Sequence, residues 1–107
     1  LKRAIMVALH SQEYITAYDE TPLLFQTWSP PKATKLMADV LVVHGYCEHG
    51  GRYREFGHAM AEQGIVTHTI DLRGHGRSGG QRGYIEHFSH YLNDVSIGKV
   101  FVRSYNC

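Results

Sequence analysis

The sequence predicts an α/β fold in which parallel strands alternate with helices. Segment 40–44 is an almost continuous apolar run, as strands are when both faces of their sheet are covered, and 65–72 is interpreted as a second strand of this buried type. Each is followed by a glycine-rich loop and then by a segment with helical spacing of apolar residues. The repeated order of strand, loop and helix is typical of βαβ units with right-handed crossovers.

The composition is that of one ordinary globular domain. The chain has 107 residues, of which 43% are hydrophobic and 20% charged, with a formal net charge of +1. This length holds at most one ordinary domain, and the scattered charge does not indicate nucleic acid as a partner. Two cysteines, Cys47 and Cys107, do not make a disulfide framework, so we expect a reducing, cytoplasmic location.

A β-hairpin is predicted at the start of the fold, over residues 11–29. Its strands are the β-rich segments 13–18 and 23–28, which are joined by turn-forming residues at 19–22. A polar connector, 32–38, then leads to the first apolar strand.

Two helices are predicted from the spacing of apolar residues. The first covers 52–63 and stops at Gly64, since glycine commonly ends helices. The second covers 86–95, where apolar residues recur at i, i+3, i+4 and i+7. The apolar faces consist of Tyr53, Phe56, Ala59 and Met60 in the first helix and Phe88, Tyr91, Leu92 and Val95 in the second.

Three motif matches lack the structural context that their chemistry requires. Residues 76–80 fit the G-x-S-x-G nucleophile elbow, but Ser78 lies in a long loop rather than in a tight strand-to-helix turn. Residues 74–79 fit the G-x-G-x-x-G dinucleotide pattern, but no helix opens directly behind them. Residues 45–50 have the glycine spacing of a P-loop, but Gly51-Arg52 stands where Lys and Ser or Thr are needed.

Histidine and cysteine side chains in the two loops raise the question of a metal site. His44, Cys47 and His49 lie in the first loop and His75 lies in the second. A zinc site needs three or four convergent ligands, normally with acidic support. Because the chain holds eight histidines, chance clusters are expected, and hydrogen-bonded loop histidines are the favoured interpretation.

The dipeptide His44-Gly45 directly follows a buried strand, a place that suits an oxyanion hole. Acyl transfer develops negative charge on a carbonyl oxygen, which a fixed backbone N–H can stabilise. Glycine lets the backbone approach a substrate closely, and the donor would be the N–H of Tyr46. A glycine-rich turn without chemistry is the competing interpretation of this dipeptide.

A resemblance to a known family is carried by four stretches of the sequence. Val-Val-His-Gly-Tyr-Cys-Glu-His-Gly-Gly-Arg-Tyr at 42–53 resembles the oxyanion loop of monoacylglycerol lipases and related lysophospholipases. Asp-Leu-Arg-Gly-His-Gly-Arg-Ser at 71–78 resembles the second characteristic loop of that family. Residues 80–84 and 88–94 continue the match.

The resemblance implies the N-terminal portion of an α/β-hydrolase fold: an antiparallel hairpin, then parallel strands with crossover helices. We expect residues 1–107 to be one partial domain, with a family-like region from about 13 to 95 and a divergent tail at 96–107. The triad of the family runs Ser, Asp, His, and its serine follows the fifth strand. We therefore expect a chain truncated before that serine, without the Ser, Asp and His of the triad. The tail residues 100–102 could imitate a strand.

The resemblance also implies roles for individual residues. Tyr46 would supply one oxyanion N–H, and the residue after the absent serine would supply the second. His44 would steady the loop, while His75 and Ser78 would shape their loop rather than react. The remaining supporting residues are Gly45, Glu48, His49, Asp71, Gly74 and Gly76.

The function implied is hydrolysis of a monoacylglycerol or lysophospholipid ester through an acyl-enzyme. The partner would be a lipid-like small-molecule ester, and neither a cofactor nor a metal is implied. Any transient membrane contact or association of a full-length form would involve downstream regions. This chain alone is expected to be inactive. A non-catalytic binding or decoy fragment of the same family, and a metal-dependent hydrolase using His44, His49 and His75, stay open as alternatives.

The family's strand order has a physical consequence for this chain. The fourth strand lies between the second and third, and the fifth lies beside the third. Without the fifth strand, residues 40–43 form an exposed apolar edge, which invites aggregation. We therefore expect the chain alone to be marginally stable or unstable.

Overall fold

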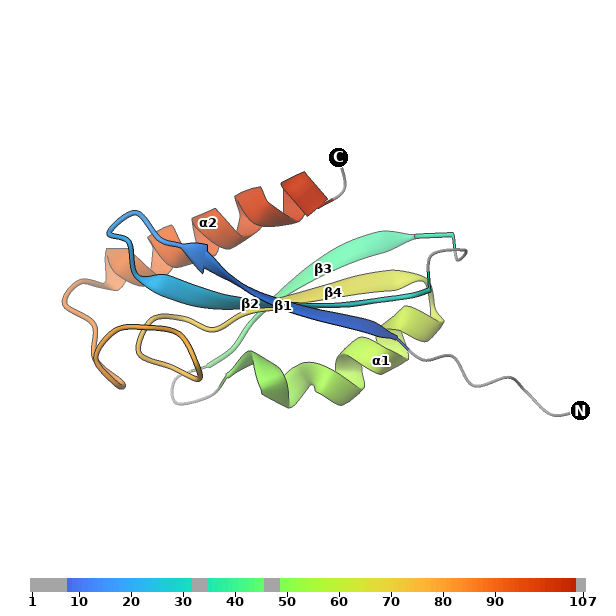
Figure 1. Ribbon diagram of the computed structural model, residues 1–107, viewed down its shortest axis with the longest axis horizontal. Coiled ribbons are helices and arrows are strands. Elements are labelled where there is room, and N and C mark those ends of the chain that lie inside the picture. Colours follow the sequence, from blue (N-terminus) through green and yellow to red (C-terminus); the bar gives the residue numbers. More distant parts are fainter. Residues whose placement is uncertain (1–7, 32–34, 46–48, 106–107) are drawn as a thin grey trace, which may run out of the picture.

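A computed structural model describes residues 8–31, 35–45 and 49–105 of the chain (Figure 1). A four-stranded mixed sheet carries one helix on each face, which confirms the predicted α/β class. The strand order is β1-β2-β4-β3, so β4 lies between β2 and β3 as expected. The elements are β1 Leu9–Thr16, β2 Pro22–Ser29, β3 Ala38–Val43, η1 Gly50–Tyr53, α1 Arg54–Glu62, β4 Ile65–Ile70 and α2 Phe88–Tyr105.

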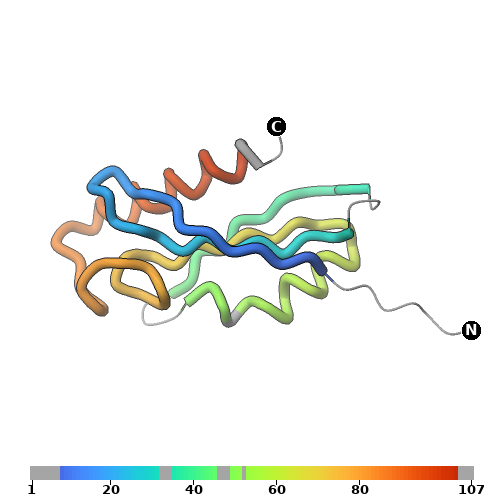
Figure 2. The backbone as a smooth tube through the Cα atoms, in the orientation of Figure 1, coloured from blue at the N-terminus to red at the C-terminus, as the bar shows by residue number. Residues whose placement is uncertain are grey.

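The N-terminal hairpin forms as predicted, and it joins the parallel pair through β2. Strands β1 and β2 pair antiparallel from Leu9↔Ser29 to Thr16↔Pro22, and β2 pairs antiparallel with β4. Strands β3 and β4 are parallel, with Val42 opposite Thr69. The carboxyl ends of this parallel pair lie at the same end of the sheet as the hairpin turn and the long loop at 71–87 (Figure 2).

The main hydrophobic core lies between the sheet and α2. Its buried members come from β1, β2, β4 and the hairpin turn, and α2 covers them with Ile97, Phe101 and Val102. The rings of Phe25 and Phe101 meet edge to face, with centroids 4.8 Å apart. Such aromatic contacts stabilise a core beyond the area they bury.

The second helix is longer than the sequence predicted. Helix α2 continues from Phe88 to Tyr105, so the expected end near Val95 is wrong, and so is a strand at 100–102. The physical reason is packing: Phe101, in the last part of the helix, packs against the sheet, and Gly98 lets the helix backbone lie close to Ile70.

Helix α1 covers the opposite face of the sheet. The side of the helix that packs against the sheet is not the side predicted to be apolar. Gly57 and Ala61 are the buried residues of α1, while Phe56, predicted on the apolar face, is 41% exposed. The large side chain here belongs to the sheet: a Cβ on Gly57 would lie 2.7 Å from Cγ of Trp28. The helix therefore packs through its small residues. Gly64, with φ of 79°, ends the helix as predicted.

Strand β3 lies at the edge of the described sheet. It pairs with β4 on one side, and Val43 is 42% exposed. This confirms the expected apolar edge. No helix in the described part of the chain is long and apolar enough to cross a membrane.

Candidate functional site

The predicted loops meet where the parallel strands end. His44 and Gly45 follow β3, and Asp71 and Leu72 follow β4 one strand away. Ligands of open α/β sheets commonly bind at the carboxyl ends of the strands. Tyr46 and Glu48, both predicted site residues, lie outside the described residues, as does Cys47.

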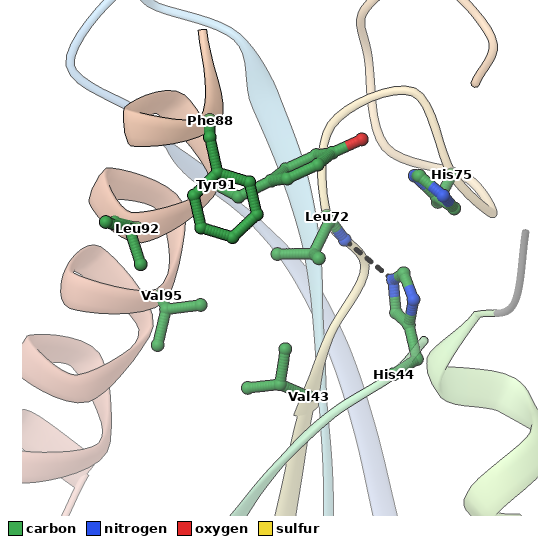
Figure 3. Close-up of a pocket in the computed structure, with 8 residues that line it drawn as sticks. All are labelled: Val43, His44, Leu72, His75, Phe88, Tyr91, Leu92 and Val95. Atoms are coloured by element: carbon green, nitrogen blue, oxygen red, sulfur yellow. Dashed lines mark hydrogen bonds between the residues drawn. The ribbon is translucent and has the colours of Figure 1, made fainter. Parts of the chain in front are cut away.

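The imidazole of His44 bridges the two strand ends. It is buried, and its Nε2 accepts a hydrogen bond from the backbone N–H of Leu72 at 2.9 Å (Figure 3). Its Nδ1 lies 2.7 Å from the carbonyl oxygen of Gly45. The ring also contacts that of His75, with centroids 5.1 Å apart. His44 therefore connects the first loop to the second.

The carboxylate of Asp71 forms a second bridge between the loops. It is buried and accepts the backbone N–H of Gly50 at 2.6 Å and that of Arg77 at 3.1 Å. Gly50 is the first residue of η1, so the acid holds the start of the helical segment against the loop after β4. Any side chain at Gly76, which has φ of 50°, would collide with this carboxylate.

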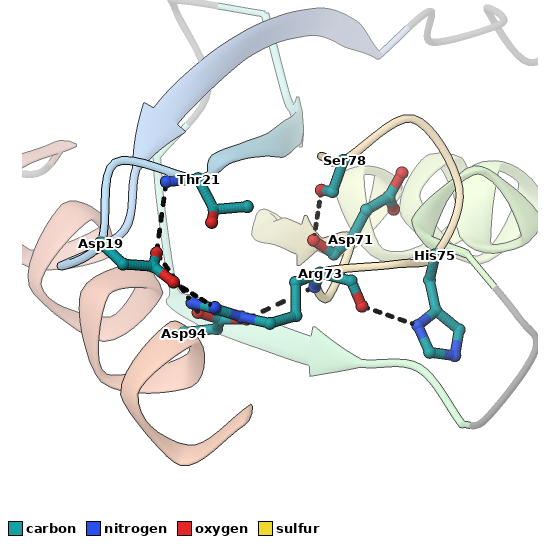
Figure 4. Close-up of polar contacts among 7 residues, drawn as sticks. All are labelled: Asp19, Thr21, Asp71, Arg73, His75, Ser78 and Asp94. Atoms are coloured by element: carbon teal, nitrogen blue, oxygen red, sulfur yellow. Dashed lines mark hydrogen bonds and ion pairs between the residues drawn. The ribbon is translucent and has the colours of Figure 1, made fainter. Parts of the chain in front are cut away.

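The hydroxyl of Ser78 is engaged with the backbone (Figure 4). It accepts the N–H of Leu24 at 2.8 Å and donates to the carbonyl oxygen of Asp71, and the residue is 3% exposed. No helix begins between Ser78 and Phe88. The serine thus ties β2 to the end of β4, and it lacks the exposure that a nucleophile elbow provides.

The other predicted loop residues shape the second loop and a cleft beside it. His75 is buried, with its Nδ1 3.1 Å from the carbonyl oxygen of Arg73, and Gly74 has φ of 76°. His49 is exposed and lines a cleft of about 390 Å³ that also includes Asp71 and Arg77. Among the described residues, no group of three or more His, Cys, Asp or Glu is arranged to hold a metal ion.

An ion cluster around Arg73, buried at Asp94 and exposed at Asp19, was not predicted from the sequence (Figure 4). Its guanidinium bonds Asp94 of α2 at 2.7 and 2.9 Å and Asp19 of the hairpin turn at 2.6 Å. The hydrogen bond that Arg73 donates to Asp19 holds the pKa of Asp19 well below its usual range, and the hydrogen bonds that Arg73 donates to Asp94 raise the pKa of Arg73. The cluster fixes α2 to the hairpin and to the loop after β4. Because 54 residues separate Asp19 from Arg73, no local pattern indicates the pair.

An apolar pocket of about 400 Å³ opens beside the two histidines (Figure 3). Val43 and Leu72 come from the strand ends, and His44 and His75 lie at one side. Phe88, Tyr91, Leu92 and Val95 line it from α2. The face predicted as apolar in the second helix therefore borders this pocket, and the core-facing residues of α2 lie further along the helix.

Comparison with known proteins identifies the class of this fold. A carboxyl esterase from Bacillus coagulans aligns with 91% of this chain and 33% of its own, with a TM-score of 0.73 and 19% identity. Esterase and α/β-hydrolase structures align similarly over 87–95% of the chain. The fold is that of the α/β-hydrolases.

Sequence comparison places the chain within that class. Residues 34–104 match the family described as serine aminopeptidase S33 (Hydrolase_4), and the chain belongs to this family. The monoacylglycerol lipase of Mycolicibacterium smegmatis is 35% identical over 72 residues, which are 67% of this chain and 25% of the lipase. An abhydrolase domain-containing protein of Dictyostelium discoideum is 39% identical over 79 residues, 74% of this chain and 8% of that protein. The resemblance to monoacylglycerol lipases is confirmed, and the chain spans a quarter or less of these relatives.

Proposed function

We propose that this chain provides the oxyanion side of a serine ester hydrolase site for a monoacylglycerol or lysophospholipid. The observation that carries the proposal is the His44–Gly45 loop, which is hydrogen-bonded to the end of β4 where the parallel strands stop. Family membership adds the class of chemistry, since the family and its lipase relatives are hydrolases by name.

The chemistry follows from charge development during acyl transfer. When an alkoxide attacks an ester carbonyl, its oxygen becomes negative, and preorganised backbone N–H groups stabilise that charge. We assign the first donor to the amide of Tyr46 and leave the second to the residue that follows the nucleophile. Asp71 supports this arrangement because its carboxylate fixes Gly50 beyond the loop.

The nucleophile in this proposal is a serine that the 107 residues do not supply. Ser78 is the serine that fits the sequence motif, but its hydroxyl already bonds Leu24 and Asp71 and is buried. An activated serine needs a neighbouring base that accepts its proton. We therefore propose that the 107-residue chain does not hydrolyse esters by itself.

A chimera tests the assigned donor. The matched segment of the Mycolicibacterium smegmatis lipase is replaced by the corresponding residues of this chain, and monoacylglycerol hydrolysis is measured. Tyr46→Pro removes the amide N–H and should lower kcat by about 10²–10³-fold. Tyr46→Phe keeps the amide and is the matched control. Equal rates for both variants, with unchanged circular dichroism, would refute the assignment.

A non-catalytic binding role is a second candidate, and one observation favours it. Val43 at the sheet edge and Phe88 and Leu92 of α2 are exposed apolar side chains around the pocket. Exposed strand edges and apolar patches commonly mark interaction surfaces. Co-elution of the purified chain with a full-length family member would support this role, and a chain that elutes separately would speak against it.

We also propose a cytoplasmic location, on the ground that two cysteines do not form a disulfide framework. Fractionation of cells that express a tagged chain would test this, and recovery in a secreted fraction would contradict it.

A further inference from the structure

The cleft beside the second loop lies on the α1 face of the sheet. Gln26 of β2 lines this cleft of about 390 Å³ together with Asp71 and Arg77. Successive strand residues point to opposite faces, so Gln26 lies on the side of Trp28 and α1, whereas Phe25 packs under α2. The cleft therefore opens on the other face of the sheet from the apolar pocket that α2 lines.

The amide of Gln26 is oriented so that its nitrogen is left for the cleft. Its Oε1 lies 2.9 Å from Nε2 of His10 and accepts a hydrogen bond from Nε2 of Gln12 at 3.3 Å. The amide nitrogen has no hydrogen-bond partner among the described residues, although Gln26 is only 3% exposed. Buried polar groups are nearly always paired. An unpaired amide on the wall of a cleft therefore points to a ligand that accepts hydrogen bonds.

The carboxylate of Asp71 adds the opposite hydrogen-bonding character. Each of its oxygens accepts one backbone N–H, from Gly50 and from Arg77. A carboxylate offers about four lone-pair sites, so about two remain for further donors. Gly76 lines the cleft next to this carboxylate, and with no side chain it leaves Oδ2 uncovered on that side. The cleft thus combines a group that only donates with a group that only accepts.

A hydroxyl group suits this combination because it donates and accepts at once. Two hydroxyl groups on adjacent carbons can donate to Asp71 and accept from the amide of Gln26. An anion would face the carboxylate of Asp71, and a cation would face the guanidinium of Arg77, so the charges favour a neutral ligand.

We propose that this cleft binds a neutral ligand with hydroxyl groups on adjacent carbons, of the glycerol or sugar type. Gln26 donates to the ligand, and Asp71 accepts from it. The proposal goes beyond the proposed ester hydrolysis and does not rest on it.

Nuclear magnetic resonance of the nitrogen-15-labelled 107-residue chain tests the proposal, with trimethylamine N-oxide added to favour the folded state. The probes are glycerol and methyl α-D-glucopyranoside. The control is 1,3-propanediol, whose hydroxyl groups are not on adjacent carbons. The side-chain N–H resonances of Gln26 should shift and saturate at millimolar concentrations of a probe, as expected for so small a ligand. The probe that binds more tightly decides between a glyceryl group and a sugar ring.

A substitution of Gln26 tests its role as the donor. Gln26→Met keeps the length of the side chain and removes both N–H groups. It should weaken binding about 3–10-fold, followed at the backbone amide of Arg77, as expected for lost hydrogen bonds. Gln81→Met, at an exposed glutamine that does not line the cleft, is the matched control and should leave the affinity unchanged.

Three results in the unsubstituted chain would overturn the proposal: shifts of the Gln26 resonances that do not saturate, an equal response to 1,3-propanediol, or a saturable response to inorganic phosphate alone. Equal affinities in Gln26→Met and Gln81→Met would also overturn it. Because the first three results need no variant, the proposal stays testable even if Gln26→Met fails to fold.

Discussion

Two glycines inside helices have opposite surroundings, and they predict opposite effects of the same substitution. At Gly57 of α1, a Cβ would lie 2.7 Å from Cγ and 2.8 Å from Cβ of the buried Trp28. At Gly98 of α2, the nearest atom is the flexible Cδ1 of Ile70 at 3.2 Å. Alanine is favoured over glycine inside a helix by about 0.8–1.0 kcal/mol at either position.

The net effect depends on whether the neighbour can move. Trp28 is 1% exposed and fixed in the sheet, so Gly57→Ala adds an overpacking cost of about 1–3 kcal/mol. We therefore expect Gly57→Ala to be neutral or to lower the free energy of unfolding by up to about 2 kcal/mol. Ile70 can adjust its side-chain end, so Gly98→Ala should raise the free energy of unfolding by about 0.5–1 kcal/mol.

Urea unfolding followed by circular dichroism measures both variants, with Ala59→Gly on the exposed face of α1 as a control for helix propensity alone. The informative quantity is the difference in unfolding free energy between Gly57→Ala and Gly98→Ala, about 0.5–3 kcal/mol. If both variants were stabilised equally, the close packing of α1 against Trp28 would be refuted.

Three further predictions concern charge and the sheet edge. Asp94→Ala leaves Arg73 without its buried partner and should lower the free energy of unfolding in urea by about 3–5 kcal/mol. Asp19→Ala removes the exposed partner and should lower it by about 0–1 kcal/mol. Similar losses for the two variants would contradict the view that burial sets the strength of each ion pair. Burial lowers the pKa of His68 below 6.5, although its hydrogen bond to Asp39 opposes the shift. The unfolded chain then binds more protons than the folded chain, so the stability that His68 contributes should be complete above pH 6.5 and decline below it. In urea titrations at several pH values, His68→Gln should flatten this decline. An unchanged decline would contradict the role given to His68. Because the apolar edge at β3 is exposed, thermal melts of the isolated chain should be broad or occur at low temperature, and a sharp transition in the usual mesophilic range, about 45–65 °C, would contradict this.

The sequence predicted the elements of the fold better than the packing between them. Strand β3 was predicted because a continuous apolar run is typical of a strand covered on both faces, and β4 was predicted as a second strand of this type in the repeated order of strand, loop and helix. The buried face of α1 was missed because periodicity gives weight to large residues such as Phe56, whereas Gly57 packs against a large residue of the sheet. The full length of α2 was missed because Phe101 is anchored to the sheet by Phe25, far away in the sequence.

In the candidate site, too, the sequence predicted where residues lie along the chain but not the contacts between them. The strand-end positions of His44 and Asp71 follow from local sequence, since each comes at the end of a predicted strand. The hydrogen bond between His44 and Leu72 joins residues 28 apart in the sequence, and that between Asp71 and Gly50 joins residues 21 apart. Sequence periodicity is local, so it cannot predict such pairs. The same holds for the cluster around Arg73, whose two acidic partners lie in a turn and in a helix.

Covalent labelling by a fluorophosphonate probe tests most directly whether the reactive serine lies outside these 107 residues. The purified chain and its Ser78→Ala variant are incubated with the probe, beside an active serine esterase as the positive control. Because the hydroxyl of Ser78 is buried and bonded to two backbone groups, we expect no labelling of either chain. Labelling of the unsubstituted chain that disappears in Ser78→Ala would contradict the account and make Ser78 the nucleophile.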